Sequence, residues 1–186
     1  MPDTFSSVWI HYVFSTKNRE SWLVPAVGAS PWPYFGAIAH QCDSMPKCIG
    51  GVSDHAHLLL PASKKFSTAE LARRLKAGSS YWIHETFPEL REFGWQAGYG
   101  AFRVGVSQLA DTVAYISDQE EHHRTKSFRE EYVGLLRKHG YSDHVLTAPF
   151  TPTLRDGADL KSYETGAEAP AYFLSAPPGR GCVTDD

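Results

Sequence analysis

The sequence is poor in cysteine and contains no long hydrophobic run. Its 186 residues include three cysteines, an odd number, and their spacing matches no metal-binding motif. We therefore expect reduced thiols rather than a disulfide framework, as is usual for cytoplasmic proteins. No window approaches the roughly 18 consecutive apolar residues of a membrane-spanning helix, and the N-terminal residues lack the basic start and apolar centre of a secretory signal. Together these features predict a cytoplasmic protein.

The chain also lacks a strong excess of charge of either sign. Its formal net charge is −3, and hydrophobic residues make up 42% of the sequence. Both values are typical of an ordinary globular domain. The charge is unevenly distributed, because residues 64–103 include seven basic and four acidic side chains, whereas residues 151–186 include three basic and six acidic ones. A local basic excess of this kind is compatible with binding of a phosphate chain.

The hydrophobic pattern predicts an α+β fold. Alternation at period two favours strands, and apolar residues at helical spacing after a capping residue favour helices. The first six elements follow the order βαββαβ, which predicts a ferredoxin-like (RRM-like) sandwich with an antiparallel sheet, and two C-terminal helices follow. The expected strands are residues 7–16, 47–52, 55–60 and 99–104, and the expected helices begin near Pro33, Ser67, Ser107 and Ser127. The helix after Ser107 is expected to continue for about 17 residues, to Arg124.

The composition divides the chain into two parts. Residues 1–141 contain every expected strand and helix and would form one domain. Residues 142–186 are rich in proline and glycine. A segment of this composition buries too little apolar surface to offset its ordering entropy, so we expect a loosely ordered tail.

Two histidines occur two residues apart on one expected strand. Alternate side chains of a strand point to opposite faces, so His55 and His57 share one face, while Ala56 occupies the other. Paired imidazoles of this kind either form structural hydrogen bonds or bind a metal ion. Two imidazoles are an incomplete metal site, so a third ligand would come from elsewhere, with Gln119, His122 and His123 as candidates.

A tyrosine lies off the expected apolar stripe of its helix. Tyr115, Gln119 and His122 are spaced i, i+4 and i+7, which places them on one side of the helix that follows Ser107. The expected core positions of the same helix lie on another side. The spacing alone is also compatible with a tyrosine on a half-exposed face with solvated neighbours.

The combination of these motifs resembles a known family. The His-Ala-His triplet at 55–57, the Arg-Arg-Leu-Lys run at 73–76 and the segment 115–123 occur in the order and spacing of the single-tyrosine transposases of small bacterial insertion sequences, including the relatives associated with repetitive extragenic palindromes (REP). These proteins are His-hydrophobe-His endonucleases that act on single-stranded DNA. The resemblance extends from about residue 8 to residue 141.

The resemblance implies a role for four residues. It identifies Tyr115 as the nucleophile, His55 and His57 as metal ligands, and Gln119 as the residue that completes the metal site. It further implies an enzyme, a transposase dependent on Mg²⁺ or Mn²⁺, that cleaves and rejoins one DNA strand through a 5′-phosphotyrosine. The expected partners are single-stranded or hairpin DNA and a second copy of the chain in a homodimer, with the tyrosine helix acting in one chain or exchanged between two. When bound to DNA, the protein would be associated with the bacterial nucleoid.

A basic surface with stacking partners would be needed to bind single-stranded DNA. Tyr99 or Phe102 could supply the stacking ring. The basic candidates for DNA binding are Lys17, Arg19, Arg73, Arg74, Lys76, Arg103 and His122.

Two other functions are compatible with parts of the pattern. A ferredoxin-like sheet with basic edges could be a catalytically idle nucleic-acid-binding domain. Alternatively, His55, His57 and either His122 or His123 could hold zinc in a hydrolase. The second alternative assigns no role to Tyr115.

Overall fold

The computed structural model describes residues 6–23 and 31–142. Within these ranges the elements are β1 (Trp9–Ser15), α1 (Trp32–Gln41), β2 (Cys48–Val52), β3 (His55–Pro61), α2 (Thr68–Thr86), β4 (Gly100–Val104), α3 (Leu109–Ser117), α4 (Gln119–His122) and α5 (Phe128–Lys138), with short 3-10 turns η1 (Lys17–Arg19), η3 (Pro88–Leu90) and η4 (Val106–Gln108). Apart from residue 142, the expected tail lies outside the described residues. The domain boundary near residue 141 therefore stays a prediction.

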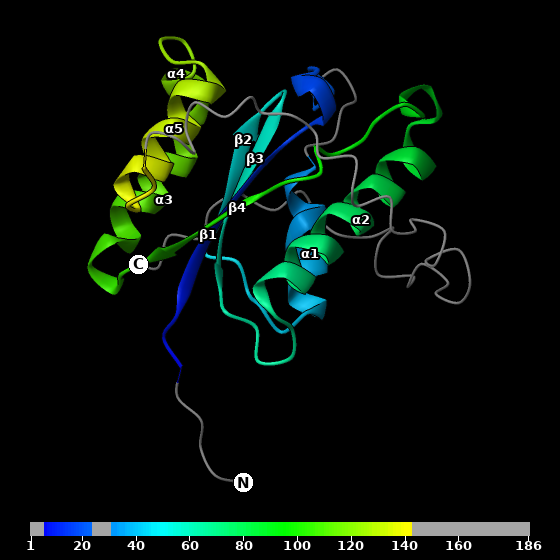
Figure 1. The fold of residues 1–186 in the computed structure, drawn as a ribbon. Coiled ribbons are helices and arrows are strands. Elements are labelled where there is room, and N and C mark those ends of the chain that lie inside the picture. Colours follow the sequence, from blue (N-terminus) through cyan, green and yellow to red (C-terminus); the bar gives the residue numbers. More distant parts are fainter. Residues whose placement is uncertain (1–5, 24–30, 143–186) are drawn as a thin grey trace, which may run out of the picture.

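The four strands form one antiparallel sheet in the order β2-β3-β1-β4 (Figure 1). This order and the succession βαββαβ are those of the predicted ferredoxin-like sandwich, so the predicted fold class is confirmed. β1 and β3 are the two central strands, and each is paired on both sides.

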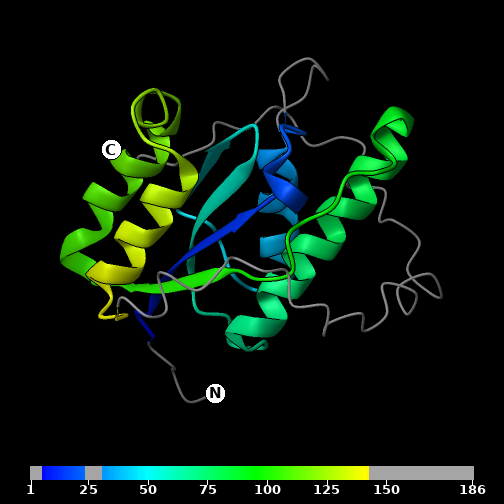
Figure 2. The ribbon, with the colours of Figure 1, turned by 45° about the horizontal axis from the view of Figure 1, so that its top comes forward.

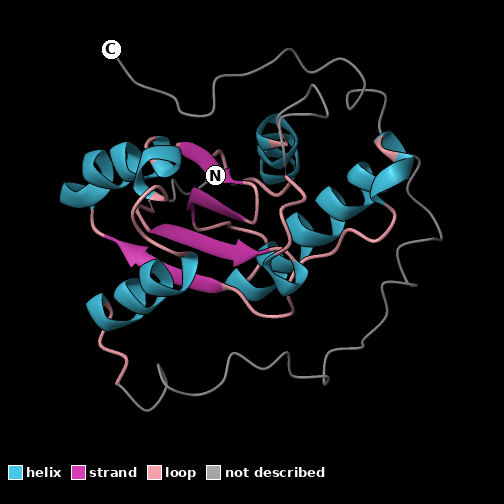
Figure 3. Ribbon diagram, turned by 90° about the horizontal axis from the view of Figure 1, so that it is seen from above, coloured by secondary structure: helices cyan, strands magenta, loops and turns pink. Residues whose placement is uncertain are grey.

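Helices cover both faces of the sheet, as the views in Figures 2 and 3 show. α1 and α2 pack on one face over a large apolar cluster that includes Tyr12, Phe14 and Leu58. The opposite face carries α3, α4 and α5, and two smaller clusters around Leu59 and Phe102 lie beneath them. The C-terminal helices therefore form a third layer on the face that the βαββαβ unit leaves uncovered.

The alternation of β3 directs its histidines toward this third layer. Ala56 and Leu58 belong to the cluster beneath α1 and α2, whereas Leu59 belongs to a cluster beneath α3. His55 and His57 share the face of Leu59, and both are fully buried. The third layer is thus built over two polar side chains at the centre of the sheet.

Two glycines allow this layer to approach the sheet. A Cβ atom on Gly50 would lie 2.6 Å from the carbonyl oxygen of Ile116, so only glycine permits the observed contact between β2 and α3. Gly51 has φ +148°, and a Cβ there would lie 2.3 Å from the carbonyl oxygen of His55. The glycine pair therefore sets the path of β2 and how closely α3, the helix that carries Tyr115, approaches the sheet.

The helix after Ser107 is shorter than predicted. A 3-10 turn covers Val106–Gln108, α3 then ends at Ser117, and α4 begins at Gln119. The expected unbroken helix to Arg124 is wrong because Asp118 has φ −100° and ψ 23°, outside helical geometry. Aspartate is a poor residue for a helix interior, since its carboxylate competes for nearby backbone groups.

The expectation for the cysteines is also partly wrong. Cys42 is a buried free thiol, whereas Cys48 is disulfide-bonded. Among the residues that the structure describes, no helix combines the length and the apolar character needed to cross a membrane.

Candidate active site

Both histidines of β3 are fixed at one ring nitrogen by a neighbouring side chain. His55 Nδ1 lies 2.6 Å from Asp54 Oδ1, and His57 Nδ1 lies 2.9 Å from His11 Nε2 on β1. Fixing Nδ1 orients each ring and leaves Nε2 for another partner, which is the usual arrangement around a metal-binding histidine. The two Nε2 atoms point into the space between the sheet and α5.

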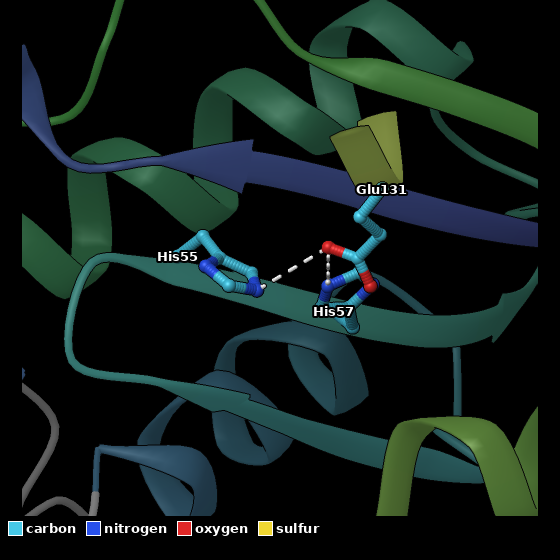
Figure 4. Close-up of side chains that lie close together, drawn as sticks. All are labelled: His55, His57 and Glu131. Atoms are coloured by element: carbon cyan, nitrogen blue, oxygen red, sulfur yellow. Dashed lines mark ion pairs between the residues drawn. The ribbon is translucent and has the colours of Figure 1, made fainter. Parts of the chain in front are cut away.

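A carboxylate from α5 reaches the same space (Figure 4). Glu131 Oε2 lies 3.6 Å from His55 Nε2 and 3.5 Å from His57 Nε2. One ligand atom from each of the three residues lies within 4.8 Å of the others, and the Glu131 residue is only 5% exposed. The arrangement gathers two nitrogens and one oxygen around a common point.

The three residues fit a divalent cation. His57 Nε2 is buried and has no hydrogen-bond partner among the described residues, and its 3.5 Å separation from Glu131 is too long for a good hydrogen bond. Leaving a buried polar atom unpaired costs about 1–3 kcal/mol. A cation bound by imidazole nitrogens and a carboxylate would remove this cost, and such mixed donors suit divalent metals.

The sequence analysis did not identify Glu131. The signal that could have revealed it is its position on α5, where Phe128, Glu131 and Leu135 have helical spacing and Phe128 is a core residue. A glutamate on the buried side of a helix is rarely fully buried unless it is paired. Its partners come from β3 and α3, far away in the sequence, so the spacing within α5 could not name them.

Tyr115 lies beside the histidine pair of the same chain. The centroid of its ring is 5.9 Å from that of His57 and 6.2 Å from that of His11, with both pairs edge to face. The Tyr115 hydroxyl donates a hydrogen bond to Glu131 Oε1. Tyr115 is half-buried, as the alternative of a half-exposed face expected, but its hydroxyl binds a protein side chain.

Gln119 connects the tyrosine to the histidines. Its side chain is buried, with the amide oxygen 3.3 Å from His55 Nε2. Its amide nitrogen donates to Glu131 Oε1 at 3.1 Å and to the carbonyl oxygen of Tyr115 at 3.2 Å. The residue thus offers an oxygen to the proposed cation position while its nitrogen restrains Glu131.

Two further histidines surround Glu131. His123 Nε2 lies 3.2 Å from Glu131 Oε2, and His122 Nε2 lies 3.8 Å from Glu131 Oε1. The His122 ring also contacts Tyr115, with a centroid distance of 5.2 Å. The His123 ring contacts His55, with a centroid distance of 4.5 Å, so both histidines adjoin the site directly.

Burial and charge set the protonation of the site. Burial lowers the pKa of His11 and of His57, and for His57 the Glu131 carboxylate only partly offsets this effect. Burial acts to raise the pKa of Glu131, but its contacts with His57 and Tyr115 outweigh burial and hold that pKa well below its usual range. Burial and the Glu131 charge raise the pKa of Tyr115. At neutral pH, the site therefore has neutral His11 and His57 rings, an ionised carboxylate and a protonated phenol.

The basic candidates for DNA binding fall into separate groups. Lys17 and Arg19 are exposed on η1, directly after β1 and next to the start of β3, because Thr16 N donates to the carbonyl oxygen of Asp54 at 2.8 Å. His122 lies at the site itself. Of these three residues, His122 contacts the site, whereas Lys17 and Arg19 follow the strand that pairs with the start of β3.

The other basic candidates lie away from the histidine pair. Arg73 and Arg74 on α2 both pair with Glu70, and Lys76 Nζ contacts the carbonyl oxygens of residues 96–98. Arg103 alternates with the inward-facing Phe102 on β4, so it lies on the α1/α2 face of the sheet. Because Phe102 is buried, its ring is not available for stacking on a base.

Comparisons with known proteins place this geometry in context. A family model described as "Transposase IS200 like" matches residues 4–119. No curated protein matches the sequence significantly. A solved structure from Deinococcus radiodurans R1, described as that of a transposase, is 23% identical over 64% of this chain and 96% of its own, with a TM-score of 0.51. A REP-associated tyrosine transposase bound to a REP hairpin is 12% identical over 77% of both chains, with a TM-score of 0.46.

Proposed function

The chain belongs to the IS200-like transposase family, and on this basis we propose that it is a metal-dependent transferase of single DNA strands with Tyr115 as its nucleophile. Membership of the family makes it a transposase, and therefore an enzyme that cleaves and joins DNA. The proposal adds which residues act, that a divalent cation is required, and that the DNA is single-stranded. The observation that supports it best is that the Tyr115 ring lies 5.9 Å from the His57 ring and that both residues contact the Glu131 carboxylate.

The proposed reaction consists of two transesterifications. The Tyr115 oxygen attacks the scissile phosphorus, forming a Tyr–O–P bond and breaking the bond to the 3′ oxygen. The phenol proton is released, and the leaving 3′ oxygen takes up a proton to become a hydroxyl. In the second step a 3′ hydroxyl attacks the same phosphorus and releases Tyr115, which regains its proton. The energy of the phosphodiester is kept in the 5′-phosphotyrosine, so no nucleotide cofactor is required.

The chain supplies donors for a divalent cation at this position. His55 and His57 would hold it through their Nε2 atoms, with Gln119 Oε1, 3.3 Å from His55 Nε2, as the further ligand that the family resemblance implies. Bound there, Mg²⁺ or Mn²⁺ would polarise the phosphate and stabilise the leaving oxygen. Asp54 and the backbone of β3 orient the ligands, and the burial of both rings excludes water.

The proposed substrate is single-stranded DNA that folds into a hairpin. His122, which lies at the site, and the exposed Lys17 and Arg19 after β1 would contact its phosphates. Tyr115 reaches the histidines of its own chain, so one chain contains the whole proposed constellation. The homodimer expected from the resemblance stays a prediction.

A covalent-adduct assay tests this function. The protein is incubated with Mn²⁺ and a single-stranded oligonucleotide carrying a foldback hairpin, and the products are separated on a denaturing gel. We expect a protein–DNA adduct that EDTA prevents. Tyr115→Phe should abolish the adduct while DNA binding in a gel-shift assay persists, because the substitution removes only the nucleophilic oxygen.

Tyr81→Phe is the matched control, since Tyr81 is exposed on α2 on the other face of the sheet. It should form as much adduct as the wild type. A gel shift without any adduct would indicate an idle binding domain. Cleavage that Tyr115→Phe retains would indicate a hydrolase and overturn the proposal.

A further inference from the structure

We infer that Glu131 is a further protein ligand of the cation, beside His55, His57 and Gln119, and that its other oxygen positions the Tyr115 hydroxyl. The inference rests on the proposed function, because it assigns a new residue to the same site. Glu131 lies on α5, beyond residues 4–119 that match the family model. The residue therefore belongs to a part of the chain that the family assignment does not describe.

The first argument is the direction of the ring nitrogens. His55 and His57 are both anchored at Nδ1, so their Nε2 atoms converge on Glu131 Oε2 at 3.6 and 3.5 Å. His57 Nε2 is buried without a hydrogen-bond partner in the described part of the chain. These distances are longer than good hydrogen bonds, and the three donor atoms surround a point that a cation can occupy.

The second argument is the separate use of the two oxygens of Glu131. Oε1 accepts hydrogen bonds from the Tyr115 hydroxyl and from Gln119 Nε2. These two donors restrain the carboxylate, and they leave Oε2 directed at the histidine pair and at His123 Nε2, which is 3.2 Å away. Cation binding at Oε2 and positioning of the nucleophile at Oε1 are consequently compatible in a single rotamer.

The third argument is the rigidity of the segment that carries Glu131. Ser127 and Glu130 form a reciprocal capping box that fixes the first turn of α5. Phe128 is buried, and its ring lies 4.6 Å from the His55 ring. Precise placement by packing and capping is what a ligand position requires, because small displacements of a ligand weaken a metal site.

The Glu131 carboxylate therefore connects binding of the cation with positioning of the Tyr115 hydroxyl. A cation bound at Oε2 and the Tyr115 hydroxyl at Oε1 would contact the two oxygens of the same carboxylate. Removing the carboxylate charge should weaken cation binding, and it should also misplace the hydroxyl when the cation is supplied in excess. Gln119, by contrast, supplies a neutral oxygen and would add less to the affinity.

Metal binding provides a test that does not depend on activity. Isothermal titration with Mn²⁺ is performed on the full chain, and the visible absorption of Co²⁺ reports the coordination of the bound ion. We expect Glu131→Gln to lower Mn²⁺ affinity by at least about tenfold, since even residues that only support a ligand contribute 10–100-fold. It should also change the Co²⁺ spectrum.

Two variants serve as controls. Glu130→Gln removes the same charge from the neighbouring position, which is exposed, and glutamine can still close the capping box. It should leave the Mn²⁺ affinity within about twofold, a difference of only about 0.4 kcal/mol. Tyr115→Phe should also retain the cation, and it separates loss of metal from loss of the hydroxyl. Circular dichroism in EDTA checks folding, and Glu131→Asp replaces Glu131→Gln should the latter fail to fold.

The outcomes distinguish the inference from the proposed function. Equal Mn²⁺ affinity and an unchanged Co²⁺ spectrum in Glu131→Gln, with affinity lost in His57→Ala, would overturn the inference and leave the function intact. Metal binding that depends on Glu131 in a protein that forms no DNA adduct would support the inference and overturn the function. A reduced rate of adduct formation in Glu131→Gln at saturating Mn²⁺ supports the positioning of Tyr115, and a wild-type rate would overturn that part.

Discussion

His11 Nε2 lies 2.9 Å from His57 Nδ1, and the two buried rings are stacked with their centroids 5.1 Å apart. Burial lowers the pKa of His11, so its ring is neutral at physiological pH and can accept the Nδ1 hydrogen of His57. When His57 Nδ1 is the donor, the Nε2 lone pair of His57 faces the site. A residue on the neighbouring strand therefore supports the form of His57 that can bind a cation.

His11→Phe should weaken metal binding while preserving the shape of the side chain. The substitution removes the acceptor for His57 Nδ1, and loss of such a supporting partner typically costs about 10–100-fold in affinity. Isothermal titration with Mn²⁺ measures the effect. His40→Phe, at an exposed histidine near the end of α1, should bind Mn²⁺ as the wild type does. Unchanged affinity in His11→Phe would show that His57 is oriented without this hydrogen bond.

Gly50→Ala should destabilise the protein and displace α3. The new methyl group would lie 2.6 Å from the Ile116 carbonyl oxygen, a backbone atom that cannot move aside cheaply. Overpacking of this kind typically costs about 1–3 kcal/mol. Urea unfolding in EDTA measures the loss of stability, and the adduct assay should show a slower reaction because Tyr115 is carried on α3.

Gly134→Ala is the matched control for Gly50→Ala. Gly134 lies within α5, and a Cβ there would meet no atom within 4 Å. Replacing a glycine in a helix interior by alanine should stabilise the protein by about 0.5–1 kcal/mol. The two substitutions should therefore change the free energy of unfolding in opposite directions. Equal effects would show that the contact between Gly50 and Ile116 does not limit the approach of α3.

The metal-free protein should lose stability as the pH falls below about 6.5. His11 and His57 have pKa values below the 6.5 of a free histidine, so the unfolded chain binds protons that the folded chain does not. Their contribution to stability is complete above pH 6.5 and is lost as the pH falls toward the folded pKa values. Each histidine contributes at most about 1.4 kcal/mol per pH unit.

Urea unfolding in EDTA at pH 7.5, 6.5 and 5.5 measures this dependence. His11→Phe removes one of the two groups and should give a shallower slope than the wild type. A wild-type free energy of unfolding that stays constant between pH 7.5 and 5.5 would contradict the assignment of neutral, buried rings.

The basic residues beside the site should contribute more to DNA binding than Arg103. Lys17 and Arg19 lie next to the start of β3, whereas Arg103 lies on the other face of the sheet. Replacing Lys17 and Arg19 by glutamine should lower the affinity for a single-stranded oligonucleotide. The slope of log K against log salt concentration should fall by about 0.7 for each phosphate that the variant no longer neutralises. An equal effect of Arg103→Gln, measured by fluorescence anisotropy, would show that the strand uses both faces.

Much of the architecture could be predicted from local sequence signals. Alternation along β3 indicated that His55 and His57 share a face, and the serine caps marked the starts of α2 and α5. The break at Asp118 was missed because residues 117–127 are all polar, so no apolar spacing marks where the helix stops. Helical periodicity reports which side of a segment is buried, but it does not report where the backbone departs from the helix.

The membership of the site could be predicted only in part. Tyr115 and Gln119 are one helical turn apart, so their spacing predicted that they lie together. Glu131 and His11 come from other elements, and their contacts depend on how α5 and β1 pack against β3. No spacing within one segment encodes a contact between segments. The packing of a third layer on the sheet was needed to bring them into the site.

The partners of the basic side chains on α2 have a consequence for electrostatics. Arg73 and Arg74 share Glu70, and the ammonium group of Lys76 is surrounded by backbone carbonyl oxygens. The excess of positive charge counted along residues 64–103 already includes Glu70, so these contacts restrain the cations and do not cancel them. An approaching polyanion would meet basic groups whose donors are partly occupied by protein acceptors, and it would have to displace these contacts to bind over α2.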